Sequence, residues 1–190
     1  MSNRTSASYA WAASIPDDAV VCLDTETTGV SVRRDEVLQV SLVRGDDVVL
    51  MNELVKPVRH VSWRQAERIH GITPQQVEDA CSLCDLIPEI NWILSHARLI
   101  VGYNLRFDMG FLERAGVRHP CCPLFDVMRA FAPIANVCGE DGSLMWRSLE
   151  DCARYYGVVF KPHDALEDAR ATLACFRRMM KHEGRWQHGA

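Results

Sequence analysis

What the sequence lacks already narrows the class of protein. Its 190 residues contain no apolar run of the roughly 18 residues that a membrane-spanning helix needs. Residues 1–18 are small and polar, without the charged segment and apolar core of a secretory signal. Internal repeats and low-complexity segments are also absent. We therefore expect a protein of the cytoplasm with no membrane association.

Lysine is scarce and the overall charge is negative. Only Lys56, Lys161 and Lys181 occur beside the arginines, and the formal net charge is −4. Such a chain is not held on nucleic acid by a basic surface alone. A nuclease is still compatible with this charge, because a carboxylate site is a negative patch that metal ions and phosphate complete. Arginine suits bidentate phosphate contacts, although codon usage explains the preference equally well.

The eight cysteines are compatible with two structural roles. Without an export signal the thiols are expected to stay reduced, and we expect most of them to be small buried hydrophobes. Cys81 and Cys84 form a CxxC pair and Cys121 and Cys122 are adjacent, so a zinc site is conceivable. The second pair lacks the spacing of a zinc knuckle, which argues against zinc.

Apolar patterning predicts an α/β fold. Residues 19–26 are apolar and β-branched and end in polar residues, as in a buried strand followed by a turn. Residues 36–57 predict two further strands joined by a tight turn at residues 45–47, which gives a three-stranded antiparallel start. The next segment predicts two short helices, N-capped at Ser62 and Thr73 and separated by Gly71. A strand at 98–104 and a helix ended by Gly116 follow. The last elements are a strand running into a helix at 122–131, a helix capped by Ser148 and a final helix at 163–182.

This order of elements predicts a mixed sheet flanked by helices in a single domain. We place that domain at residues 19–182, after a flexible N-terminal segment at 1–18 and before a C-terminal tail at 183–190.

Acidic residues at strand and helix ends are the candidates for chemistry. Asp24 and Glu26 are two apart at a strand end, so both point to one face and can share a metal ion. Such a pair is expected about once by chance, but two acids at the end of a buried strand are costly without a cation or solvent. Asp108 begins the helix after the next strand, where it is equally suited to stabilise the helix dipole.

His163 and Asp168 flank the start of the final helix. Five helical steps rotate by about 140° and rise about 7.5 Å, so two helical residues could not share a metal face. A loop position for His163 and a helical position for Asp168 would let both face one cleft. A histidine here is also a common surface or capping residue, and Asp164 and Glu167 are neighbouring acids that compete for the functional role.

Several segments resemble one nuclease family. CLDTETTG at 22–29, LIVGYNLRFDMGFL at 99–112 and HDALEDARAT at 163–172 resemble, in order, the three motifs of DnaQ-like, or DEDDh, 3'-5' exonucleases. AERIHGIT at 66–73 and SLEDCARYYGV at 148–158 resemble segments of the proofreading epsilon subunit of bacterial DNA polymerase III, the branch that is most similar in motifs. The resemblance covers nearly the whole chain.

The resemblance implies a ribonuclease H-like fold with a mixed five-stranded sheet. It also implies metal-dependent release of nucleoside monophosphates from 3' ends, with two divalent ions, Mg2+ or Mn2+, on four carboxylates. The implied ligands are Asp24, Glu26, Asp108 and Asp168. His163 is implied as general base, a role that suits an imidazole titrating near neutrality.

The same resemblance implies a set of substrate contacts. Ile69 and His70 would lie against the terminal nucleoside, and the backbone from Thr25 to Thr27 near its 3' hydroxyl. Asn104 and Phe107 complete the expected set, with Phe107 or Trp146 as a stacking surface for bases. The basic residues of the final helix are either a solvated face or a guide for a single strand; they are Arg170, Arg177, Arg178, Lys181 and Arg185.

Substrate and partners stay open at this level. Thr27 and Thr28 resemble the proofreading branch more than oligoribonuclease, where Met is typical, which weakly favours DNA over RNA, and we expect single-stranded 3' ends as the substrate. Tyr103 stands where some relatives have His, and we expect this to affect packing more than chemistry. The chain ends without the long tail by which proofreading subunits attach to their polymerase, which argues against membership of a replication complex. A DNA polymerase, a repair protein and a second copy of the chain are the candidate partners.

Two rival functions are weaker. A catalytically silent DnaQ-like binding module would be free to lose any of the five chemical residues, yet all of them are present. A phosphatase with an aspartyl nucleophile would leave Asp108, His163 and Asp168 without roles.

Overall fold

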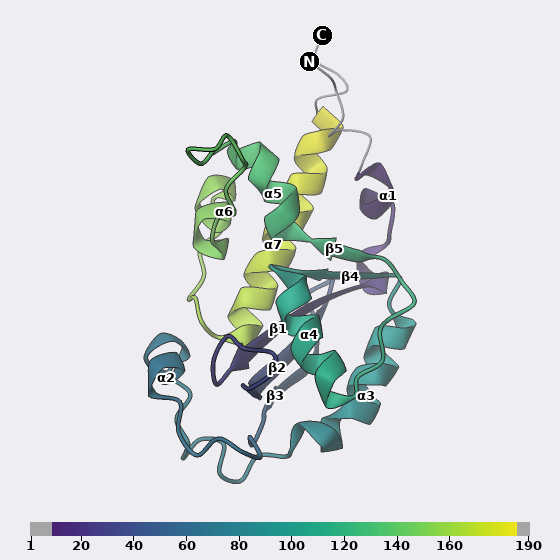
Figure 1. Cartoon of the computed structure of the whole chain (residues 1–190). Helices are drawn as coiled ribbons and strands as arrows, with labels where there is room; N and C mark the ends of the chain where they lie inside the picture. The colour runs from purple at the N-terminus through teal and green to yellow at the C-terminus, as the bar shows by residue number, and fades with distance from the viewer. Residues whose placement is uncertain (1–8, 186–190) are drawn as a thin grey trace.

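A computed structural model describes residues 9–185 and is built around a five-stranded mixed sheet (Figure 1). Across the sheet the strand order is β3-β2-β1-β4-β5. The first three strands in sequence pair antiparallel, whereas β4 and β5 run parallel to β1. Their bounds are β1 Val20–Thr27, β2 Val37–Arg44, β3 Val49–Leu54, β4 Leu99–Gly102 and β5 Leu124–Asp126. The predicted mixed sheet with an antiparallel start is confirmed.

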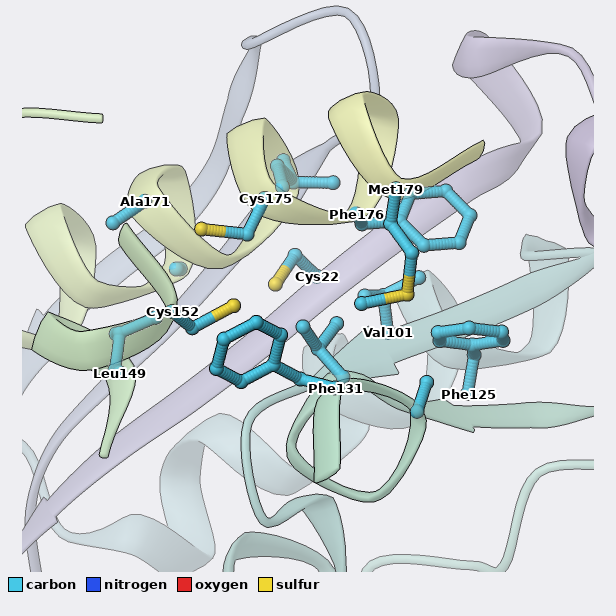
Figure 2. Close-up of a cluster of buried hydrophobic side chains, with 14 of the residues drawn as sticks. Cys22, Val101, Phe125, Phe131, Leu149, Cys152, Ala171, Cys175, Phe176 and Met179 are labelled. Carbon is cyan, nitrogen blue, oxygen red and sulfur yellow. The ribbon is translucent and has the colours of Figure 1, made fainter. Parts of the chain in front are cut away.

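Helices cover both faces of this sheet, as its alternating side chains require (Figure 1). Leu23 of β1 packs in a cluster with α3 and α4, while Cys22 packs on the other face with α5, α6 and α7. Figure 2 shows this second layer, in which Cys175 and Met179 of α7 lie beside Cys22. The helices span α3 Leu83–His96, α4 Leu105–Ala115, α5 Val127–Ala135, α6 Leu149–Tyr156 and α7 Ala165–Arg185.

The segment between the hairpin and α3 differs from the prediction. Helix α2, Arg64–His70, has Trp63 rather than Ser62 at its N-cap, and it ends at Gly71 with φ 75°. The second short helix expected after Thr73 is a series of turns. Tertiary packing competes with the local pattern here, since Ile72 and Val77 are buried with Trp63 in a separate small core, where the indole Nε1 of Trp63 donates to the carbonyl of Ile72 at 2.7 Å.

Residues 9–18, which we expected to be flexible, are folded. Helix α1, Ala10–Ala13, is followed by a 3-10 turn, Asp17–Ala19. Ala12 is buried, and the ring of Tyr9 packs edge-on against Phe125 with 5.1 Å between centroids. Aromatic burial therefore extends the core to this segment, while residues 1–8 and 186–190 lie outside the described part. Within that part, no helix is both long and apolar enough to cross a membrane.

The cysteines divide between core and surface. The buried ones are Cys22, Cys152 and Cys175, all in the layer of Figure 2. Four others are exposed, so the expectation that most are buried is wrong; they are Cys81, Cys84, Cys121 and Cys138. These four lie outside the strands and helix faces that form the core, or on the solvent side of α3. Among the described side chains, no cysteines gather into a group that could hold a metal ion.

Candidate active site

Three carboxylates meet where the central strand ends. Asp24 and Glu26 project from the same side of β1, because side chains two residues apart on a strand share a face. Asp168 reaches them from the beginning of α7, the helix that covers this face. One oxygen from each carboxylate lies within 4.8 Å of the others. Oxygen atoms this close, all from carboxylates, form the donor set that hard divalent cations prefer.

The electrostatics of this group are strongly unfavourable without a cation. Burial raises the pKa of Asp24 well above its usual value, and repulsion from Asp108, Asp168 and Glu26 raises it further. Burial, followed by the nearby acids, raises the pKa of Glu26 to about 8. Burial likewise raises the pKa of Asp168 to about 7. A bound cation would remove this repulsion, so the donor set fits a metal ion.

Asp108 approaches from the other face of the sheet. It lies in the first turn of α4 and is 3% exposed. Its Oδ1 accepts hydrogen bonds from the Thr25 backbone N–H at 3.0 Å and the Thr25 hydroxyl at 2.7 Å. Burial raises the pKa of Asp108 to about 7, although the bonds from Thr25 oppose this shift. The fourth predicted ligand is therefore adjacent to Asp24 but outside the 4.8 Å cluster.

His163 lies in the loop before α7 in a left-handed conformation with φ 68°. Its backbone N–H donates to the Asp168 carboxylate at 3.2 Å, which ties the loop to the cluster. The imidazole Nε2 is 3.9 Å from a carboxylate oxygen of Glu150 at the start of α6. The two competing acids are occupied elsewhere: Asp164 accepts from the first N–H groups of α7, and Glu167 pairs with Arg170 at 3.2 Å.

A buried glutamine fixes the start of α7. Gln39 of β2 is 6% exposed and lies opposite Glu26 in the strand register. Its Oε1 accepts from the Ala165 N–H at 3.2 Å, and its Nε2 donates to Asn52 at 3.0 Å. The sequence analysis missed both Gln39 and Glu150. The available signal was the glutamine inside the apolar segment VLQVSLV, because a buried side-chain amide is expected to have hydrogen-bond partners.

The expected wall of the nucleoside site lies beside the same strand end. His70 Nδ1 accepts from the Ile72 N–H at 3.0 Å, so its proton is assigned to Nε2, which donates to the Thr27 carbonyl at 3.3 Å. Burial lowers the pKa of His70. Ile69 beside it is 57% exposed, which leaves an apolar side chain accessible. The Thr27 hydroxyl itself donates to the Gly29 carbonyl at 2.7 Å.

The remaining predicted substrate contacts, Asn104 and Phe107, lie at the start of α4. Asn104 is the N-cap of α4 with φ 59°, and its N–H donates to Asp126 at 3.1 Å. Phe107 is half-buried and packs on Phe111 with 5.0 Å between centroids.

Three arginines of α7, among the side chains that the structure describes, have structural partners. Arg177 pairs with Asp47 at 3.1 Å and Arg178 donates to the Tyr156 carbonyl. Together with the Arg170 pair, these contacts favour the interpretation of this cluster as structural and solvated rather than as a guide for a strand.

Known proteins share this fold and sequence. Residues 21–176 match the RNase_T family model, described as exonuclease. The PolC-type DNA polymerase III of Thermotoga petrophila is 32% identical over 171 residues, which are 86% of this chain and 12% of the polymerase. The corresponding Bacillus subtilis polymerase is 26% identical over 88% of this chain and 12% of its own length. The chain thus spans about an eighth of these relatives.

Solved structures agree on the fold. Escherichia coli exonuclease I, crystallised with a dA16 oligonucleotide, superposes with a TM-score of 0.71 at 21% identity, over 87% of this chain and 41% of that one. Exonuclease I from Methylocaldum szegediense gives 0.68 at 24% identity, over 87% and 41%. The match of the family model to most of the chain, around the carboxylates of β1, α4 and α7, shows that this chain belongs to the DnaQ-like 3'-5' exonuclease family.

Proposed function

We propose that this chain is a 3'-5' exonuclease that hydrolyses the terminal phosphodiester of single-stranded nucleic acid, with DNA preferred over RNA. Water adds across the bond between phosphorus and the 3' oxygen, which releases a nucleoside 5'-monophosphate and leaves a 3' hydroxyl on the shortened strand. The observation that carries the proposal is the convergence of Asp24, Glu26 and Asp168 within 4.8 Å, with Asp108 alongside.

The four carboxylates would hold two divalent ions, Mg2+ or Mn2+. When bound, these ions supply positive charge for the attacking water and for the leaving oxygen. Thr25 keeps Asp108 oriented through its two hydrogen bonds, and Gln39 keeps the first turn of α7 in place for Asp168. His163 then receives the proton of the attacking water on its imidazole, whose Nε2 lies 3.9 Å from a carboxylate oxygen of Glu150.

The preference for DNA is supported by the relatives, which are DNA polymerases. Their names also support a DNA polymerase as partner of this chain, while a repair partner, a homodimer and a cytoplasmic location stay predictions. Light scattering of the purified chain, alone and mixed with a candidate polymerase, measures the assembly directly.

The test is digestion of DNA and RNA oligonucleotides labelled at either end, with Mg2+, Mn2+ or EDTA. We expect metal-dependent release of mononucleotides from the 3' end, faster for DNA. Asp168→Asn should abolish release with the fold retained, because it removes one member of the cluster. Glu167→Gln is the matched control, since this adjacent acid pairs with Arg170 and should keep near-normal activity. Folded protein that binds metal and cleaves neither polymer would refute the proposal.

A further inference from the structure

An exposed apolar hairpin lies between α5 and α6. Residues 137–145 form a short two-stranded turn closed by backbone bonds from Met145 to Val137 at 2.8 Å and from Gly139 to Ser143 at 2.9 Å. The hairpin and the residue after it present an apolar set to solvent: Val137 at 38%, Leu144 at 43%, Met145 at 45% and Trp146 at 56% exposed. Clustered apolar side chains that stay exposed mark a surface for binding.

The base of this hairpin is fixed to the active-site end of the sheet. The Tyr103 hydroxyl is 2.8 Å from the carbonyls of both Arg147 and Ser148. Tyr103 directly follows β4 and precedes Asn104, the N-cap of the helix that carries Asp108. The residues that follow Trp146 are therefore hydrogen-bonded to the turn before α4, the helix that carries the proposed metal ligand Asp108.

An arginine side chain lies beside the exposed indole of Trp146. The guanidinium carbon of Arg129 lies 5.9 Å from the ring centroid of Trp146. Arg129 also lines a hollow of 530 Å³ next to β5, together with Arg106 and the 42% exposed Trp11. Within residues 9–181, neither Arg106 nor Arg129 forms an ion pair.

The acids that border the hollow are already engaged. Glu113 binds His119 at 2.5 Å, and Asp126 accepts the backbone N–H groups of Asn104 and Arg129. The surface made by Trp146, Arg129, Arg106 and Trp11, here called the Trp146 strip, therefore combines accessible aromatic rings with unpaired arginines.

We propose that the Trp146 strip binds the single strand upstream of the terminal nucleotide, with one base stacked on Trp146. The inference rests on the proposed function, in which the carboxylates receive the 3' end. Every base offers a π-face to an indole, and a neighbouring guanidinium contacts both base and phosphate, so this combination binds a strand without reading its sequence. Arg129 beside the indole and Arg106 in the adjoining hollow, both without an acidic partner, favour a polyanion over an apolar protein partner.

The test compares a ten-nucleotide oligothymidylate with the p-nitrophenyl ester of thymidine 5'-monophosphate, which contains no upstream nucleotide. Trp146→Ala should raise KM for the oligonucleotide by about 10-fold, the loss of one stacked base, and change kcat by less than about 2-fold. The ester should be hydrolysed at its former rate. Trp146→Phe should restore most of the affinity, and Arg129→Gln should weaken both the affinity and its dependence on salt.

Trp92→Ala is the matched control. Trp92 is 62% exposed and lies on α3, on the opposite face of the sheet, so its loss should leave both substrates unaffected. An unchanged oligonucleotide KM in Trp146→Ala would overturn the inference. An equal loss on the ester would also overturn it, because the change would then act on the metal site.

Failure of the proposed function is recognisable separately, as wild-type protein that hydrolyses neither substrate. Fluorescence anisotropy with labelled oligothymidylate then decides the inference without catalysis. Weaker binding by Trp146→Ala supports the strip as a strand site. Equal binding by wild type and variant overturns it and leaves the hairpin as a surface for a protein.

Discussion

Replacing Glu26 with glutamine should stabilise the metal-free protein while removing its function. Burial and the neighbouring acids raise the pKa of this carboxyl from 4.5 to about 8. A group with a raised folded-state pKa binds a proton on folding, so its ionisation opposes folding progressively from about pH 4.5 to about pH 8. At roughly 1.4 kcal/mol per pH unit, the opposition at pH 7 is about 3 kcal/mol. The buried amide retains part of the desolvation cost, so we expect a gain of about 1–3 kcal/mol.

Urea denaturation in EDTA at pH 5, 7 and 8 measures this gain. The difference between Glu26→Gln and wild type should be small at pH 5 and grow toward pH 8. Glu53→Gln, which alters an exposed acid on β3, is the matched control and should show no such trend. In Mg2+ the order should reverse, because a cation that binds only the folded wild type stabilises it by mass action. A variant that is less stable than wild type in EDTA at pH 8 would refute the reasoning.

Three further predictions concern groups around the site. Gln39→Leu should lower kcat by about 10-fold and stability by about 1–2 kcal/mol, because the N–H of Ala165 loses its buried acceptor; steady-state kinetics and urea denaturation measure both. Glu36→Ala should lower the free energy of unfolding by about 1–3 kcal/mol above pH 4.5. Burial opposes ionisation of the Glu36 carboxyl, yet the hydrogen bonds from residues 58–60 lower its pKa to about 2. That contribution is lost as pH falls from about 4.5 to about 2, so acid denaturation of the variant should lack this step. His163→Gln should lose about 100-fold in turnover yet keep metal affinity, as measured by calorimetry; equal losses in both would contradict a role as base.

Periodicity was sufficient to predict the sheet because β1 to β4 are short apolar segments bounded by turns. The pairing of Asp24 with Glu26 also follows from sequence alone, since a strand places residues two apart on one face. The loop position of His163 before α7 was predictable because Pro162 and helical geometry exclude a shared helical face with Asp168.

The contacts that could not be predicted all depend on tertiary structure. The turns after Thr73 pack Ile72 and Val77 in a small core with Trp63, and local propensity does not encode that packing. The bond from Ala165 to Gln39 joins residues far apart in the chain, as does the packing of Tyr9 on Phe125. Likewise, the sequence suggested Trp146 as a stacking surface. It did not indicate that Arg129 lies beside the Trp146 ring or that an exposed hairpin precedes Trp146.

The position of the site follows from the place of β1 in the sheet. As the central strand, β1 is covered by α4 on one face and by α7 on the other, so only its end can receive acids from both layers. Asp108 arrives from one layer and bonds to Thr25, while Asp168 arrives from the other and joins Asp24 and Glu26. Four acids on a single helix would reach the end of β1 from one face only. The same convergence buries the acids and raises the pKa of each, so the geometry that prepares the site for cations also destabilises the fold without them.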